Sequence, residues 1–230
     1  MRVCCVTIVF IFLNNTPIFG QNNLAYMHVY LFGRCIGGKM QIYLTFCDYD
    51  NDFLIVKKRE FNKWWGGQVS SQNSLVNQAG QWAFPGGKCE CGSSGDDHSA
   101  DAKREFKEET GLDFPAAAQV YVYKDGRNQF QLYVYRVKSM TEMVRAICKG
   151  ATPNSAAGDR PTNLEIKDWE LGEAQIVPRD KLTEYLGKRN TNISKEAEQS
   201  IQSARKYSQS IDWYAEMATA LQRADLGPKT

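Results

Sequence analysis

The sequence lacks features that would tie it to a polyanion or to a fibrous architecture. Its 28 Lys and Arg residues nearly balance 26 Asp and Glu residues. The resulting net charge of +2 is too small to favour nucleic acid or an anionic membrane as the main partner. Internal repeats, coiled-coil heptads and long low-complexity tracts are also absent from the sequence. Partners must therefore be argued from local sites in a soluble globular chain.

A hydrophobic run long enough to span a bilayer as a helix, about 20 residues, is missing as well. The apolar run Val3–Leu13 is shorter and fits a signal peptide or leader within residues 1–23. A buried first strand, or a true start at Met27 or Met40, would explain the same residues. We therefore expect a cytoplasmic protein, or a secreted one if residues 1–20 are a signal peptide.

The cysteines are odd in number and lie in a chain too long to need disulfide staples, so we expect reduced thiols. The segment Cys89-Glu90-Cys91 either holds a soft metal or contributes two loop thiols, and no second Cys or His pair lies at zinc-ligand spacing. The seven cysteines are Cys4, Cys5, Cys35, Cys47, Cys89, Cys91 and Cys148.

Apolar and β-branched residues predict a first hairpin with strands at Ile42–Phe46 and Phe53–Val56. The next stretch, Asn62–Gly80, is rich in Gly, Ser, Asn and Gln, and we interpret it as a long polar loop. Its paired tryptophans, Trp64 and Trp65, either cover the edge of the core or stack on a base.

A second hairpin is predicted from Val120–Tyr123 and Phe130–Val137, with Asp125-Gly126 in a turn that needs positive φ. Both faces of its second strand are apolar or aromatic, which is typical of a central strand. Between the hairpins, Ser99–Thr110 has a helical pattern that ends at Gly111. Strands before and after such a helix indicate a mixed α/β layer structure.

The C-terminal half predicts a short helix at Thr141–Lys149, a strand region at Leu164–Val177 and a helix start at Pro178–Leu182. Residues 191–230 have helical apolar spacing and form one long amphipathic helix or two shorter ones. This extension packs either on the main domain, residues 24–190, or on a partner chain, giving a homodimer.

Three carboxylates share one surface of the Ser99–Thr110 helix, because Glu108 and Glu109 follow Glu105 by three and four positions. Asp101 joins them one turn earlier. Oxygen ligands of this kind suit Mg²⁺ or Mn²⁺. In the alternative the face is merely solvated, and its acids pair with the neighbouring cations Lys103, Arg104 and Lys107.

The segment Phe84-Pro85-Gly86-Gly87-Lys88 precedes this helix. Adjacent glycines let the backbone approach a bound group closely and leave amide donors free, which suits a phosphate-rich ligand. Taken singly, Pro-Gly-Gly is also an ordinary turn. Lys88 is either a further phosphate contact or a surface lysine.

Together these residues resemble the signature of the Nudix family, in which a Gly-Gly turn leads through a loop into a helix ending Arg-Glu-apolar-x-Glu-Glu-x-Gly-apolar. The resemblance covers roughly residues 41–186. The fixed positions of the second half are met by Arg104, Glu105, Phe106, Glu108, Glu109, Gly111 and Leu112.

The resemblance implies a Nudix-type α/β/α sandwich with a mixed β-sheet that hydrolyses a diphosphate bond in a nucleotide-type small molecule, using Mg²⁺ or Mn²⁺. By position, Glu108 and Glu109 would bind the metal, and Glu105 would be a further ligand or the base that activates water. Arg104 would orient Glu105. The substrate would contact the entry segment at Gly86, Gly87 and Lys88.

The entry loop departs from the family pattern. Ser93 stands where the family usually has its first glutamate, and three extra residues lengthen the loop Gly92–His98. Asp96 or Asp97 either supplies the missing carboxylate or caps the helix. This departure motivates an alternative function, a nucleotide-sensing or protein-interaction module that kept the fold and lost activity.

Family members often recruit another acid from outside the motif, and Glu165 and Glu170 are our first candidates, with Glu142 and Asp159 behind them. His98, seven residues before Glu105, either faces the site or lies at the surface, and we expect the surface position. Residues 127–130 contain neither the proline nor the tyrosine that marks some subfamilies, so the sequence does not indicate a particular nucleotide.

Overall fold

The computed structural model describes residues 40–90, 97–151, 158–204 and 208–227. The leader expected at residues 1–23 lies outside this part of the chain, as do Ser93 and Asp96. Among the helices it describes, none has the length and apolar character to cross a membrane.

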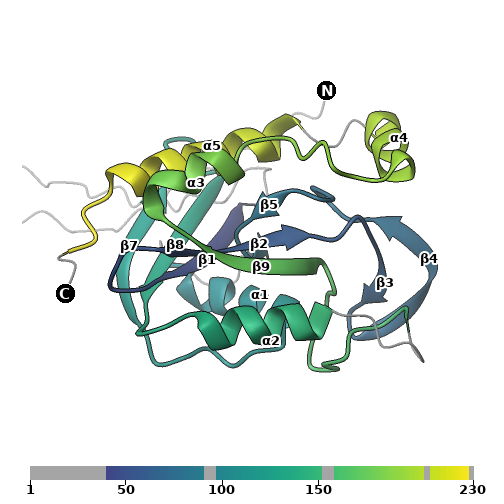
Figure 1. The fold of residues 1–230 in the computed structure, drawn as a ribbon, viewed down its shortest axis with the longest axis horizontal. Helices are drawn as coiled ribbons and strands as arrows, with labels where there is room; N and C mark the ends of the chain where they lie inside the picture. Colours follow the sequence, from purple (N-terminus) through teal and green to yellow (C-terminus); the bar gives the residue numbers. More distant parts are fainter. Residues whose placement is uncertain (1–39, 91–96, 152–157, 205–207, 228–230) are drawn as a thin grey trace, which may run out of the picture. The chain divides into compact units, whose positions relative to one another are not determined.

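The described strands build a seven-stranded mixed sheet in the order β5-β2-β1-β8-β7, with β6 paired to β1 and β9 paired to β2 (Figure 1). Strands β1 and β8 run parallel, with Gln41 opposite Phe130. The remaining pairings described in this sheet are antiparallel. The strands are β1 (Gln41–Cys47), β2 (Phe53–Lys58), β5 (Trp82–Ala83), β6 (Gly86–Lys88), β7 (Ala118–Lys124), β8 (Phe130–Arg136) and β9 (Leu171–Val177).

Both predicted hairpins are confirmed, as β1–β2 and β7–β8. Strand β8 lies between β1 and β7 and is buried along nearly its whole length, as its two apolar faces predict. The turn before it differs from the prediction, because the positive φ of 53° is at Asn128 rather than at Gly126. The Asp125 carboxylate accepts the backbone N–H groups of the turn and so stabilises a longer connection.

The prediction of a long polar loop at Asn62–Gly80 is wrong. This stretch contains a second sheet with two strands, β3 (Phe61–Trp65) and β4 (Gln68–Leu75). Strand β4 is mostly exposed and polar, so its composition hides its conformation. The overlooked signal in the sequence is the pair Gly66-Gly67, which is typical of a hairpin turn. Both residues adopt positive φ in the structure, 58° and 77°.

Helices cover both faces of the main sheet (Figure 1). Helices α1 (Ser99–Thr110) and α2 (Thr141–Ala151) lie on one face, and α3 (Leu182–Tyr185) and α5 (Ser208–Arg223) on the other. Strand β1 contacts both layers, with Phe46 packed on Phe106 of α1 and Tyr43 packed on Tyr214 of α5. The expected α/β/α sandwich is therefore confirmed.

The C-terminal extension is two helices, α4 (Lys195–Ala204) and α5, rather than one. In α4, Ala197 and Ile201 are buried, and Ile201 packs with Ala79. The apolar face of α5 enters the main core through Tyr214, Met217, Ala218 and Leu221. Because the chain's own sheet covers this face, nothing described here supports dimerisation through it.

The predicted strand region Leu164–Val177 is a strand only from Leu171 onward. Its first part is a turn-rich segment in which Trp169 packs with Trp64 and Ile166 in a separate small cluster. The Arg59 guanidinium lies 3.6 Å from the centre of the Trp169 ring. After β9, a 3-10 turn at Arg179–Lys181 leads into α3, close to the predicted helix start.

Candidate active site

The two ends of helix α1 are stabilised by neighbouring residues of the chain. The Asp97 carboxylate accepts the N–H of Ser99 at 2.9 Å at the start, and Gly111 ends the helix in a left-handed conformation with φ of 69°. The buried stripe contains Ala102, Phe106 and Glu109. One carboxylate of the motif therefore lies on the core-facing side of the helix, where it requires a partner.

That partner is Lys58, the last residue of β2. Its ammonium donates to Glu109 and, at 2.8 Å, to Glu170. The second oxygen of Glu109 accepts the Gly86 N–H at 2.9 Å. The side chains of Lys58 and Glu109 are only 3% and 4% exposed, so this contact is shielded from water.

Burial and charge act in opposite directions on this group. Burial raises the pKa of Glu109, although the Lys58 ammonium partly offsets the effect. Burial alone would lower the pKa of Lys58, but the carboxylates of Glu109 and Glu170 raise it above its ordinary value. Lys58 therefore remains an ammonium and is a cation fixed between two acids.

The other two motif acids share Arg104. Its Nη2 donates to Glu105 Oε1 and its Nη1 to Glu108 Oε2, both at 2.7 Å. Burial raises the pKa of Glu105 even though Arg104 opposes the shift. The alternative interpretation, in which Lys103, Arg104 and Lys107 pair with the acids of this helix, holds only for Arg104. Lys107 pairs instead with Asp113, and Lys103 lies over the Phe114 ring.

The two glycines of the entry segment lie so close to neighbouring atoms that a side chain at either position would collide with them. Gly86 has φ of 152°, and a Cβ there would lie 2.1 Å from the carbonyl oxygen of Ile42. A Cβ on Gly87 would lie 2.4 Å from Glu105 Oε2. The segment is a short strand paired with β1 rather than the expected open turn. Its Gly86 amide is used by Glu109, which corrects the expectation that this donor is free.

These side chains surround a polar cavity of about 260 Å³ at the junction of β1, β2, β6 and α1. Four carboxylates and two lysines lie among its lining residues, so negative charge is in excess. The cavity is lined by Gln41, Tyr43, Lys58, Asn77, Gln78, Gly86, Gly87, Lys88, Glu105, Glu109, Asp168 and Glu170.

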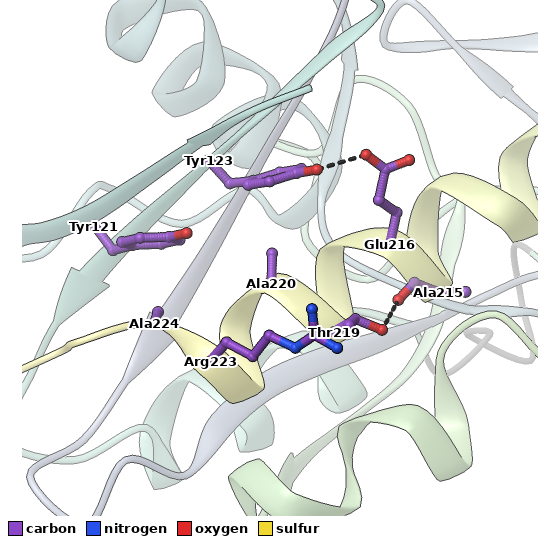
Figure 2. A pocket seen from close by; sticks show the side chains of 8 residues that line it. All are labelled: Tyr121, Tyr123, Ala215, Glu216, Thr219, Ala220, Arg223 and Ala224. Atoms are coloured by element: carbon purple, nitrogen blue, oxygen red, sulfur yellow. Dashed lines mark hydrogen bonds between the residues drawn. The ribbon is translucent and has the colours of Figure 1, made fainter. Parts of the chain in front are cut away.

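A larger cavity of about 530 Å³ lies between β7 and α5 and contains none of the motif residues (Figure 2). The Tyr123 hydroxyl donates to Glu216 at 2.5 Å across it. Burial, aided by Glu216, raises the pKa of Tyr123 to about 12. Glu216 is the one acid among the residues that line this cavity, which therefore offers no group of metal ligands. The larger volume does not make it the better candidate for the active site.

The sequence model of the NUDIX domain matches residues 50–197. The chain belongs to the Nudix family. No curated protein matches the sequence. Similar solved structures include a NUDIX hydrolase from Nitrosomonas europaea, with 14% identity, coverage of 76% of this chain and 95% of that one, and a TM-score of 0.35. MutT from Burkholderia pseudomallei has 14% identity, coverage of 75% and 99%, and a TM-score of 0.34.

The structure brings together part of the expected Nudix residue set. Glu105 and Glu109 line the cavity with Gly86, Gly87 and Lys88, whereas Glu108 is held by Arg104 outside the lining. The carboxylate oxygens fit a divalent cation such as Mg²⁺. The ammonium of Lys58 lies between Glu109 and Glu170, so the site already holds one positive charge.

Among the acids that were candidates from outside the motif, Glu170 lines the cavity. Glu165 is exposed, Glu142 pairs with Arg145, and Asp159 pairs with Lys63. Lys58 and Asp168 were missed by the sequence reasoning. Strand β2 ends in two lysines, Lys57 and Lys58. Side chains alternate between the faces of a strand, so the two lysines had to point to opposite faces, and this was the available signal.

The prediction that His98 lies at the surface is wrong. His98 is buried, and its backbone N–H donates to the Tyr133 hydroxyl at 2.7 Å. Its ring Nδ1 lies 3.3 Å from the sulfur of Cys89. Asp97 is exposed, accepts the N–H of Ser99 and is not among the residues that line the cavity. Cys91, the other thiol of the expected soft-metal pair, lies outside the described residues.

Proposed function

We propose that this chain hydrolyses a diphosphate bond in a nucleoside diphosphate derivative, with Mg²⁺ or Mn²⁺ as cofactor. The observation that carries the proposal is the convergence of Glu105 and Glu109 on the Gly86-Gly87 strand and Glu170 around one cavity. Four acids line this cavity, Glu105, Glu109, Asp168 and Glu170, and carboxylate oxygens of this kind suit a hard cation.

Of these acids, Glu105, Glu109 and Glu170 would hold the cation, together with Glu108, which Arg104 holds outside the lining. When bound, it neutralises charge that develops on phosphoryl oxygens and lowers the pKa of bound water. Lys88, at the rim of the cavity, attracts the anionic substrate. Lys58 fixes Glu109 and Glu170 relative to each other before substrate arrives.

Glu105 is suited to accept a proton from the attacking water. Burial raises the pKa of this carboxyl, although the Arg104 guanidinium opposes the shift. Arg104 holds its Oε1, while its Oε2 lies beside Gly87 at the cavity. Water adds to phosphorus, the bond to the bridging oxygen breaks, and the departing phosphate takes the electron pair.

The test is a panel of nucleoside diphosphate derivatives assayed with Mg²⁺ and Mn²⁺ for release of a nucleoside monophosphate. We expect turnover by the parent chain and its loss in Glu105→Gln and Glu108→Gln. Glu142→Gln is the matched control, because Glu142 is 81% exposed on α2. Unchanged turnover in both motif variants would overturn the proposal.

A nucleotide-sensing module is the second candidate function. The observation that favours it is the Lys58 ammonium, which balances Glu109 and Glu170 without a metal. This candidate predicts nucleotide binding that is independent of metal, with no turnover of any substrate in the panel. Isothermal titration with and without EDTA separates it from the hydrolase.

A further inference from the structure

A second group of metal-ligating side chains lies at the N-terminal end of α1. Cys89 directly follows β6, His98 directly precedes α1, and Asp101 is in the first turn of that helix. Their ligand atoms all lie within 4.8 Å of one another. Cys89 and His98 are 2% and 8% exposed, and none of the three lines the cavity of the acidic site.

The contacts within this Cys89–His98–Asp101 cluster converge on the sulfur. The Cys89 Sγ lies 3.3 Å from His98 Nδ1 and 3.3 Å from Asp101 Oδ2. In a nucleophilic triad the acid would instead orient the imidazole through its other nitrogen. Here the acid contacts the thiol itself, so the arrangement resembles three ligands around a common centre.

The spacing matches a small tetrahedral ion. Zinc bonds of about 2.3 Å to sulfur and about 2.0–2.1 Å to nitrogen or oxygen place tetrahedral ligands about 3.5 Å apart. The two separations of 3.3 Å from the Cys89 sulfur require shifts of only a few tenths of an ångström, and the third pair, His98 with Asp101, lies within 4.8 Å. We propose that Cys89, His98 and Asp101 bind a zinc ion that is distinct from the divalent cation of the acidic cavity.

The ligand types also decide against Mg²⁺ here. Magnesium prefers six oxygen ligands and keeps several waters, whereas a thiolate and an imidazole are ligands that zinc accepts readily. Three protein ligands leave a fourth tetrahedral position for water or another donor. The backbone N–H of His98 is held by Tyr133, which fixes the position of the residue before any metal binds.

A zinc ion at this cluster would join the end of β6 to the start of the catalytic helix. Asp101 connects the two sites, because its Oδ2 faces the thiol while its Oδ1 lies 3.6 Å from Nε of Arg104. Arg104 in turn holds Glu105 and Glu108. Zinc would therefore fix the helix start at the loop that is longer than the Nudix pattern.

The experiment uses the full chain expressed without a polyhistidine tag, stripped of metal and titrated with Co²⁺, then with Zn²⁺. We expect one equivalent of Co²⁺ to give a thiolate charge-transfer band in the near ultraviolet, and Zn²⁺ to displace it. The band should vanish in Cys89→Ser. In His98→Gln and Asp101→Asn, the Co²⁺ affinity should fall by about tenfold or more.

Two controls separate this site from other ligands. Cys148→Ser removes a half-buried thiol on α2 and should leave the band unchanged. Glu108→Gln alters the acidic site and should also keep the band, so failure of the diphosphatase proposal and failure of this one are distinguishable. Far-UV circular dichroism checks folding, and Asp101→Asn decides if Cys89→Ser does not fold.

Three results would overturn the zinc proposal. The first is a parent chain that gives no thiolate band at stoichiometric Co²⁺. The second is a band that persists in Cys89→Ser. The third is a Co²⁺ affinity that is unchanged from the parent chain in both His98→Gln and Asp101→Asn.

Discussion

The Lys58 ammonium is buried against the Glu109 carboxylate, which joins the end of strand β2 to helix α1 across a sequence separation of 51 residues. Glu170 contacts the same ammonium from the segment before β9. One cation therefore connects three parts of the chain around the candidate active site. Its removal would leave two acids close together with no positive partner.

Lys58→Met should destabilise the metal-free protein by about 3–5 kcal/mol, because breaking a buried pair leaves an uncompensated charge. Mg²⁺ should recover part of this loss if it binds the same acids. Urea unfolding with and without Mg²⁺ measures both effects. Lys57→Met is the control, since Lys57 pairs with Glu173, which is 57% exposed. Equal losses in the two variants would contradict the assigned role of Lys58.

Glu170→Gln should raise the Mg²⁺ concentration needed for half-maximal activity by about tenfold or more, as loss of a metal-site partner typically does. The amide keeps the size of the side chain and removes its charge. Glu165→Gln changes an exposed acid five positions earlier and should leave the Mg²⁺ requirement unchanged. A Mg²⁺ titration of both variants would exclude Glu170 from the site if the two curves coincide.

Gly87→Ala should lower turnover by about 100-fold, because its Cβ would lie 2.4 Å from Glu105 Oε2 and displace that carboxylate. Stability should change little, since the displaced group is the end of a flexible side chain. Gly126→Ala, where a Cβ meets nothing within 4 Å, is the matched control. Steady-state kinetics and thermal unfolding together test the claim, and full activity of Gly87→Ala would refute it.

The sequence predicts those parts of the fold that depend on neighbouring residues. Helix α1 has the predicted bounds, Ser99–Thr110, because its apolar spacing and the terminating Gly111 are local signals. Strands β1 and β8 follow from their apolar runs. Strand β4 was missed because its residues are polar and its conformation depends on pairing with β3.

The candidate site was less predictable because most of its contacts are long-range. No local pattern indicates that Lys58 meets Glu109, or that Glu170 rather than Glu165 reaches the cavity. Burial of His98 likewise depends on Tyr133, which is 35 residues away in the sequence. Motif spacing locates the acidic helix, whereas the partners of its acids are decided by packing of the sheet.

Helix α5 provides a test of whether the C-terminal extension belongs to the domain core. Leu221 is fully buried in the same cluster as the central strands. Leu221→Ala should therefore cost about 2–5 kcal/mol, from lost burial and the cavity left behind. Leu164→Ala is the control, because Leu164 is 53% exposed. Urea denaturation should give one cooperative transition for Leu221→Ala at a lower midpoint. A midpoint equal to that of Leu164→Ala would mean that α5 adds nothing to the core, and that residues 191–230 are an independent appendage.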